Sequence, residues 1–399
     1  MRADFSSQNY FRNPAGEIEK LRSAGPVVEV RFPIVGTVWT TTTQDLADRV
    51  LKDDDTFTLR RDDGSVAGLK WWMPGMLRTL TNNMLAMDEP NHTRLRDIVD
   101  EAFRRRAILD MEPRILAIAD ELAEELFQEG SPADLVDRYA RKMPLSVICE
   151  LLGLPLADRP TFTAWANSFT RFTGAIGLLR VIPSFFAMKR YMERRLEAVR
   201  EHGGDGLIAE LVRVEKEGGR ISRIEMVSML FLLLLAGHET TAHLISGSVY
   251  ELLRDRGLRD WLEEDWNRTS LAVEEFLRFI SPVQFAKPRF VRKDVNLGGV
   301  WLKKGEKIMP MLAAANLDPK ANANPEKLDL ERKSNRHIAF GTGIHFCLGH
   351  QLARIEGSCA LKALFRRWPK LELAVDEPQI KWRKRPGLRA IEHLPVATL

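Results

Sequence analysis

The segment Phe340–Arg354, FGTGIHFCLGHQLAR, gathers residues suited to metal chemistry around one thiol, Cys347. Gly341 and Gly343 precede the cysteine and Gly349 follows it. Because glycine adopts positive φ and allows close backbone approach, this spacing predicts a tight loop pressed against something large and flat. The apolar pattern turns helical directly afterwards, so Cys347 is expected at a helix N-terminus, where a metal-ligating thiolate is favoured. A buried, inert cysteine would not explain the glycines.

A second pattern interrupts a long apolar helix. Met226–Ala236 is apolar at nearly every position, which predicts a helix that runs through the core. The run GHETT at 237–241 then places a glycine, a carboxylate and two hydroxyls at mid-helix. Glycine there costs about 1 kcal/mol relative to alanine, and a buried carboxylate needs water or a partner. A bond from Thr240 to the carbonyl of Ala236 would open the helix locally and leave a groove.

The same run does not fit a zinc protease helix. HETTAH separates His238 from His243 by five positions, which is about 140° around a helix of 3.6 residues per turn. The H-E-x-x-H motif needs a separation of four, so that both histidines face one ion. A polar kink without chemistry remains as the alternative interpretation.

The cysteine segment resembles the haem-binding loop of the cytochromes P-450. The family pattern F-x-x-G-x-[RH]-x-C-x-G is matched by Phe340, Gly343, His345, Cys347 and Gly349. By this resemblance Cys347 is the axial thiolate of the iron of haem b and the metal ligand of the protein. The resemblance also places around the haem Phe340, Gly341, His345 and Gly349. His350 departs from the pattern, because many relatives carry a small residue there.

The interrupted helix also resembles a family motif. The pattern [AG]-G-x-[DE]-T is matched by Ala236, Gly237, Glu239 and Thr240. The resemblance implies that Ala236 contacts the haem, that Glu239 relays protons and that Thr240 stabilises the iron-bound peroxide. Glu239 and Thr240 are therefore the predicted catalytic residues.

Other positions match the propionate contacts and scaffold of the family. His92 and Arg96 share one face of a helix that begins near Pro90, because they are four residues apart. The resemblance makes them donors to the haem propionates, together with Arg289 and His345. Glu275 and Arg278 match E-x-x-R, a buried structural pair that Arg332 is expected to join. Leu328 stands where relatives usually have phenylalanine.

The fold is predicted to be mainly α, with small peripheral β-sheets. Hairpins are expected over 27–43 and around Gly298–Gly299, where β-branched and aromatic residues flank turn signals. Helices are expected over 91–108, 112–128, 134–152, 186–200, 223–254 and 350–368. No linker or repeat divides the sequence, so residues 1–399 are predicted to form a single domain. The resemblance implies the cytochrome P-450 fold, with haem between the long central helix and the cysteine-loop helix.

Composition narrows the class of protein. The net charge of +4 gives no argument for nucleic-acid binding. The three cysteines are too few and scattered for a disulfide framework, which favours a reducing compartment. No secretory leader is recognised at the N-terminus, and no run of 18 apolar residues occurs, so no membrane span is predicted. We therefore expect a cytoplasmic protein.

The resemblance implies a haem-thiolate monooxygenase. It would insert one oxygen atom from O₂ into a small apolar organic substrate, by hydroxylation or epoxidation. NAD(P)H would supply electrons indirectly, through a separate ferredoxin or flavodoxin with its reductase. A peroxide-driven haem enzyme and a non-catalytic haem-binding protein are the alternatives. The substrate, and whether a carrier protein delivers it, are not predicted.

Two surfaces are expected to serve this activity. The segment 61–83 is irregular, and long irregular segments in compact domains are often functional, although a surface loop that tucks its tryptophans into the core is the alternative. The resemblance implies that this segment caps an apolar substrate pocket. The predicted pocket residues are Trp71, Trp72, Met73, Met76, Val283, Phe285 and Leu388. A basic docking surface for an acidic redox partner is predicted from Arg104, Arg105, Arg106, Lys362, Arg366 and Arg367, although such runs are often simply solvated.

Overall fold

The computed structural model describes residues 4–32, 35–61, 63–66, 83–105, 108–171, 174–218 and 221–398. The predicted pocket residues Trp71, Trp72, Met73 and Met76 lie outside these ranges. So do the side chains of Arg104, Arg105 and Arg106.

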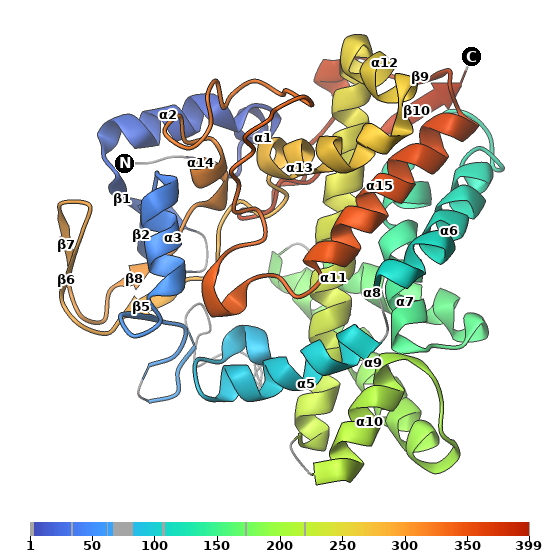
Figure 1. Cartoon of the computed structure of the whole chain (residues 1–399), viewed down its shortest axis with the longest axis horizontal. Coiled ribbons are helices and arrows are strands. Elements are labelled where there is room, and N and C mark those ends of the chain that lie inside the picture. Colours follow the sequence, from blue (N-terminus) through green and yellow to red (C-terminus); the bar gives the residue numbers. More distant parts are fainter. Residues whose placement is uncertain are drawn as a thin grey trace.

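Helices form most of the described chain, as predicted (Figure 1). The N-terminal part contributes α1 (Gln8–Arg12), α2 (Pro14–Ala24), α3 (Gln44–Lys52), α5 (Asn91–Arg105) and α6 (Glu112–Glu125). The central part contributes α7 (Lys142–Leu152), α8 (Arg159–Arg171), α9 (Gly174–His202), α10 (Gly206–Gly218) and α11 (Arg223–Arg254). The remainder contributes α12 (Arg256–Glu264), α13 (Thr269–Ile280), α14 (Leu312–Asn316) and α15 (His350–Arg367).

The α11 helix passes through the middle of the molecule, with α15 and then α6 beside it (Figure 1). Its first turn is fixed by a capping box, in which Ser222 accepts from the backbone N–H of Glu225 and Glu225 bonds back to Ser222. The residues that follow are almost all buried and apolar. Burial on every side explains why this helix shows no polar face.

The strands form three small sheets. The largest has the order β1 (Val27–Phe32), β2 (Gly36–Thr41), β8 (Lys307–Ile308), β5 (Arg289–Val291) and β3 (Phe57–Thr58). A second sheet joins β4 (Ala133–Asp134), β10 (Pro395–Thr398) and β9 (Leu371–Leu373), and β6 (Val295–Leu297) pairs with β7 (Val300–Leu302). Both predicted hairpins, β1–β2 and β6–β7, are confirmed as antiparallel pairs.

Helix boundaries differ from the prediction in two places. The stretch predicted as one helix over 134–152 begins with a π-turn at Val136–Ala140 before α7. The α9 helix begins at Gly174, twelve residues before the predicted start, and contains Pro183. Proline usually ends a helix, because it lacks the N–H donor and its ring clashes with the preceding turn, but α9 continues on both sides of Pro183.

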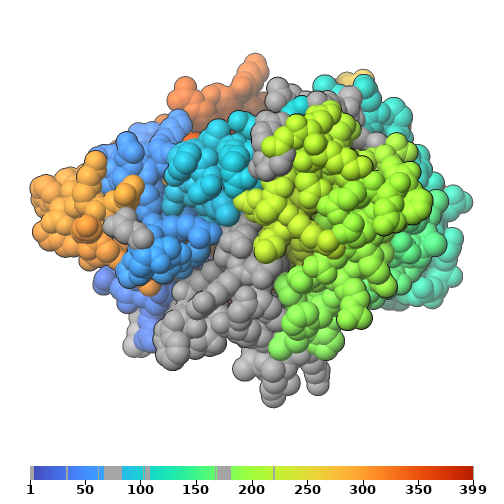
Figure 2. Space-filling model, turned by 90° about the horizontal axis from the view of Figure 1, so that it is seen from below, coloured from blue at the N-terminus to red at the C-terminus, as the bar shows by residue number. Residues whose placement is uncertain are grey.

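The view from below separates the two sides of the molecule (Figure 2). The β6–β7 hairpin and the N-terminal segments lie on one side, the green helices α9 and α10 lie on the other, and α5 lies between them. An ion pair of 2.5 Å from Arg94 to Glu225 fastens α5 to the first turn of α11. This contact fixes the helix of the predicted propionate donors against the central helix.

Candidate active site

A cavity of about 410 Å³ lies between the cysteine loop and the middle of α11. Cys347 lines it from the loop, and Ala236, Gly237 and Thr240 line it from the helix. The volume is within the range of small-molecule sites, and most of the lining is apolar. The two chemical patterns of the sequence therefore face one space.

The cysteine loop is shaped by its own backbone. The N–H of Cys347 donates to the carbonyl of Phe340 at 3.0 Å, and that of Phe346 donates to Gly343 at 3.0 Å. Gly343 has φ of +73°, and a Cβ on it would lie 2.3 Å from the carbonyl oxygen of Leu51. Only glycine fits here, so the predicted tight loop with a close approach is confirmed, although the close neighbour is α3.

The predicted thiolate bias of Cys347 was wrong for the polypeptide alone. The α15 helix begins at His350, three residues after the cysteine. Burial raises the pKa of the Cys347 thiol, and the N–H of Gly349 and the charges of Arg96 and Arg354 only partly oppose this. A cation bound directly to sulfur would favour the thiolate much more strongly.

The cavity fits a flat, dianionic group such as haem. A Cβ on Gly349 would have no atom within 4 Å, so that glycine leaves room for a group against the loop. The Nε2 atom of His345 is buried and has no hydrogen-bond partner in the protein. Burial, and then the nearby charges of His92, Arg289, Lys287 and Arg96, lower the pKa of His345 to about 2. An anion beside these groups would supply the missing hydrogen-bond partner of His345 and would reduce the repulsion among the basic side chains.

The four predicted propionate donors, His92, Arg96, Arg289 and His345, all line the cavity. The rings of His92 and His345 meet edge-on with centroids 4.5 Å apart. Arg289 is buried and donates to the carbonyl of Phe57 at 3.0 Å. Arg96 also donates to the carbonyl of Phe346 at 2.8 Å, which ties α5 to the cysteine loop. This structural role of Arg96 was not predicted.

The middle of α11 presents backbone to the cavity. Ala236 and Gly237 are exposed although the helix around them is buried, because both face the cavity. Thr240 donates to the carbonyl of Ala236 at 2.9 Å, as predicted, and Thr241 donates to Gly237 at 3.1 Å. The predicted opening of the helix was wrong, since α11 is continuous from Arg223 to Arg254. The small side chains, rather than a break, create the groove.

Glu239 lies beside the cavity lining rather than in it. Its Oε1 atom accepts from Nη1 of Arg385 at 2.5 Å, and Nε2 of His243 lies 3.8 Å away. Burial raises the pKa of Glu239, but the neighbouring His243 and Arg385 outweigh it and hold the pKa below its ordinary value. Sequence analysis missed Arg385, which lies 146 residues away and belongs to no local pattern.

The E-x-x-R pair is fully buried at one end of α13, as predicted. Arg278 donates to both oxygens of Glu275, at 2.7 and 2.8 Å. Arg332 joins them through Nε at 3.1 Å, as expected. The neighbouring Glu274 contacts Arg354 of α15 and His337, a second ion-pair cluster that the sequence did not reveal. These two clusters hold the segments on either side of the cysteine loop.

The predicted substrate residues are only partly tested by the described chain. Val283 and Phe285 line the cavity. Leu388 is not among the lining residues, but it forms a β-bridge with Val283. Two charged residues of the lining were not predicted: Lys287, and Glu356 of α15, whose pKa burial raises to about 8.

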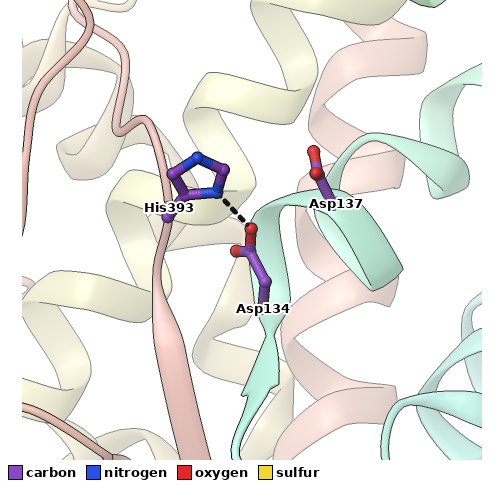
Figure 3. A group of neighbouring side chains, drawn as sticks. All are labelled: Asp134, Asp137 and His393. Atoms are coloured by element: carbon purple, nitrogen blue, oxygen red, sulfur yellow. Dashed lines mark hydrogen bonds and ion pairs between the residues drawn. The ribbon is translucent and has the colours of Figure 1, made fainter. Parts of the chain in front are cut away.

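The described residues contain one other group of close metal-ligand side chains, Asp134, Asp137 and His393. Figure 3 shows His393 directed at Asp134, with which it forms a 2.6 Å hydrogen bond, while Asp137 points apart from both. Asp137 forms an ion pair with Arg141 at 2.6 Å, and Asp134 accepts from the backbone of Val136 and Leu394. These bonds explain the group as a structural join between β4 and the C-terminal segment.

Among the described helices, α11 is long and apolar enough to cross a membrane by length and composition alone. It passes this test although the sequence has no unbroken run of 18 apolar residues. The burial of most of its residues inside the protein explains the same composition. The test is therefore weak evidence for a membrane span.

Comparison with known proteins gives consistent matches. The family model described as Cytochrome P-450 matches residues 180–384. The vitamin D(3) 25-hydroxylase of Pseudonocardia autotrophica is 39% identical over 98% of this chain and 96% of its own length. The 6-deoxyerythronolide B hydroxylase of Saccharopolyspora erythraea is 36% identical over 94% of each chain. A myxobacterial cytochrome P-450 in complex with myristic acid has a TM-score of 0.89 and 34% identity, covering 99% of this chain and 98% of that one.

Proposed function

Because the chain belongs to the cytochrome P-450 family, of the bacterial type, we propose that this monooxygenase oxidises a small, mainly apolar organic substrate. One oxygen atom of O₂ enters the substrate, by hydroxylation or epoxidation. Electrons from NAD(P)H arrive through a ferredoxin or flavodoxin with its reductase. Residues 1–399 form one haem domain, which acts in the cytoplasm.

The main observation in support of this proposal is that the cysteine loop and the middle of α11 line the same cavity. Cys347 lies on one side, and Ala236, Gly237 and Thr240 lie on the other. A thiol faces a helix segment that is bare of large side chains and is followed by hydroxyls and a carboxylate. This arrangement supports ligation from one side and O₂ and substrate binding from the other.

The residues of the cavity fit haem in defined roles. Cys347 would ligate the iron, and His92, Arg96, Arg289 and His345 would contact the propionates. Ala236, Phe340, Gly341 and Gly349 would lie against the ring faces. When bound, haem supplies the O₂ chemistry, and its thiolate ligand favours O–O cleavage. The polypeptide supplies orientation, exclusion of water and protons.

Glu239 and Thr240 are the proposed route for protons. The Oγ1 of Thr240 lies on the cavity side of α11, bonded to the carbonyl of Ala236. The carboxylate of Glu239 lies one residue away, outside the cavity lining and beside Arg385. A proton taken up by Glu239 can therefore pass toward the cavity by way of the Thr240 hydroxyl.

The lining residues favour a largely apolar substrate. Leu232, Leu233, Val283, Phe285 and Leu244 contribute apolar surface to the cavity. Burying apolar area gives about 25 cal/mol per Å². An apolar ligand would therefore bind mainly through its hydrocarbon surface.

A basic surface of α15 is the proposed docking site for the redox partner. Arg366 and Arg367 are exposed on the last turn of the helix that follows the cysteine loop, and Lys362 is partly exposed. Charge reversal at these positions is expected to raise the apparent KM for ferredoxin and leave substrate affinity unchanged. Unaltered dependence on ferredoxin would contradict this docking site.

The function is tested by titrating the purified ferric protein with a ligand panel while recording the Soret band. A shift from low to high spin with one compound class, followed by a product 16 Da heavier in a system with NAD(P)H, ferredoxin and reductase, is expected. Activity with hydrogen peroxide alone, and none with the electron-transfer proteins, would favour the peroxide-driven alternative. A protein that takes up no haem during haem-supplemented expression would refute the proposal.

A further inference from the structure

We propose that Arg385 is a positioning residue for proton delivery, which holds the Glu239 carboxylate at the solvent end of the path to Thr240. This inference rests on the proposed function, because it assumes that Glu239 carries protons. It concerns a loop that contributes no residue to the described cavity lining.

The contact joins a buried carboxylate to an accessible cation. The side chain of Glu239 is 11% exposed, whereas that of Arg385 is 41% exposed, and their closest atoms are 2.5 Å apart. Thr240, the next residue, lines the cavity. Glu239 therefore lies one residue from the cavity and one ion pair from solvent, which is the position required of a group that carries protons inward.

Glu239 has a second partner within reach. Nε2 of His243 is buried without a hydrogen-bond partner and lies 3.8 Å from the Oε1 atom that Arg385 holds. His238 is anchored differently, since its Nδ1 atom is bonded to the carbonyl of Leu234 at 2.7 Å. The His238 ring lies near Glu239, Arg141 lies near His238, and the carboxyl of Glu356 interacts with Thr241 of the same helix segment. A carboxylate released by Arg385 can turn to His243, so the ion pair selects between two positions.

The loop that carries Arg385 is held to the wall of the cavity. The N–H of Gln284 donates to the carbonyl of Gly387 at 2.9 Å, and Leu388 bridges Val283. The N–H of Leu388 donates to the carbonyl of Arg385 at 3.2 Å, which forms a tight turn. Arg385 is thus placed by its loop's contacts with the segment that carries Val283 and Phe285, two residues that line the cavity.

The proton balance is simple. A proton from bulk water binds the Glu239 carboxylate, leaves it toward the hydroxyl of Thr240 and enters the cavity, and the carboxylate is restored. Arg385 remains charged throughout, so it exchanges no proton in the cycle. Its role is to keep the carboxylate ionised and aimed at solvent between proton transfers.

The test compares Arg385→Gln and Arg385→Lys with Lys384→Gln, which removes one charge from an exposed neighbour in the same loop. Arg385→Gln is expected to lower the product formed per NAD(P)H by roughly tenfold, as for loss of a charge-assisted hydrogen bond. Hydrogen peroxide and the solvent isotope effect should rise, and the pH midpoint of turnover should move up. Arg385→Lys should recover part of the loss, and Lys384→Gln should match wild type.

The haem spectrum and the substrate-induced Soret shift are expected to remain unchanged in Arg385→Gln. Loss of either, or equal losses in Lys384→Gln, would show a merely structural role and overturn the inference. An unchanged product yield, isotope effect and pH midpoint would overturn it as well. Glu239→Gln distinguishes failure of the proposed function from failure of the inference. If Glu239→Gln forms as much product per NAD(P)H as wild type, the proposed role of Glu239 is wrong. If Glu239→Gln forms less product per NAD(P)H while Arg385→Gln is normal, only the inference is refuted.

A second observation concerns Lys287, and from it we infer that the substrate carries an anionic group, such as a carboxylate, on its apolar body. Lys287 lines the cavity, and within the described part of the chain its Nζ atom donates to the carbonyl of Leu85 at 3.3 Å. It lies in the extended segment between Phe285, which faces the cavity, and Arg289, a proposed propionate donor.

Charge in the cavity supports this inference. Arg96, Lys287 and Arg289 are cations of the lining. Among the described lining residues the one carboxyl is that of Glu356, which is favoured in the neutral form because burial raises its pKa to about 8. Two propionates would partner Arg96 and Arg289, which leaves the Lys287 ammonium for a third anion. Burial, and then the charge of Arg60, lower the pKa of Lys287 to about 8, so it is largely charged at neutral pH.

The test uses long-chain and aryl carboxylic acids and their methyl esters as matched probes in Soret titrations. Wild type should bind an acid more tightly than its ester, and Lys287→Met should reduce that ratio by roughly tenfold while the ester binds as before. An unchanged ratio would refute the inference. Weakened haem retention in Lys287→Met, with the ratio intact, would instead assign Lys287 to a propionate and also refute it. Absence of any Soret shift in wild type would count against the proposed function itself.

Discussion

Replacing Glu275 with alanine is expected to destabilise the protein by about 3 kcal/mol. Glu275 and Arg278 are almost wholly buried, with 1% and 0% of their side chains exposed. The two carboxylate oxygens accept from Arg278, Arg332, the amide of Asn335 and the N–H of Asp329, at 2.7 to 3.1 Å. The variant would leave two buried guanidinium groups without their counter-charge.

The size of the loss in stability depends on the hydrogen bonds that the arginines retain in the variant. Removing one partner of a buried ion pair costs about 3–5 kcal/mol. Arg278 still donates to the carbonyls of Asn316, Pro325 and Lys327, so its hydrogen bonds are partly retained. The lower end of the range therefore applies. Glu275→Gln keeps the shape and one acceptor, and should cost about half as much.

Urea unfolding of the haem-loaded protein, followed by circular dichroism, measures this difference. The matched control is Glu331→Ala, which removes an exposed carboxylate next to Arg332 and should change stability by less than about 0.5 kcal/mol. If Glu275→Ala unfolds within about 1 kcal/mol of wild type, the cluster does not stabilise the fold as argued. A mere loss of haem with unchanged unfolding would also contradict the reasoning.

Three further predictions concern the site and its frame. Cys347→Ser should lose the absorption spectrum typical of thiolate-bound haem with CO, and a retained spectrum would overturn the ligand assignment. Thr240→Ala should bind haem and substrate normally but divert electrons to hydrogen peroxide; a steady product yield per NAD(P)H would contradict the proton route. Burial alone would raise the pKa of Glu274, but His337 and Arg354 outweigh it and lower the pKa from 4.5 to about 2. This contribution to stability, about 1–2 kcal/mol after solvent screening, is present above pH 4.5 and lost as pH falls toward 2. As the pH is lowered, the urea midpoint of Glu274→Gln should therefore fall less steeply than that of wild type. Equal pH dependence of the two midpoints would contradict the assignment.

The elements nearest the cavity were predictable because their signals are local. The α11 helix was predicted over 223–254 and is observed over the same residues, since a capping box precedes a long apolar run. The α5 helix begins at Asn91, directly after Pro90, as the spacing of His92 and Arg96 indicated. The glycines of the cysteine loop were also informative, because positive φ and a close approach leave few other residue choices.

The contacts that were missed join segments distant in sequence. Arg385 is paired with a carboxylate 146 residues earlier, and Arg354 with one 80 residues earlier. Neither pair produces a local sequence pattern, because each partner alone resembles an ordinary surface charge. The ionisation of Cys347 was mispredicted for a different reason. The favourable field of a helix end amounts to about 1 kcal/mol, whereas burial of a thiolate costs more.

The charges around the cavity argue that haem binding and folding are coupled. Burial shifts the pKa of Cys347 upward and that of His345 downward, so each group is displaced toward its neutral form. A dianion with a central cation would reverse both effects, because propionates favour the protonated imidazole and iron favours the thiolate. The residues proposed to hold haem would therefore gain stability from it. A ligand that binds only the folded chain stabilises that state by RT ln(1 + L/Kd), where L is the free ligand concentration, so the proposed haem contacts would contribute to the fold as well as to the chemistry.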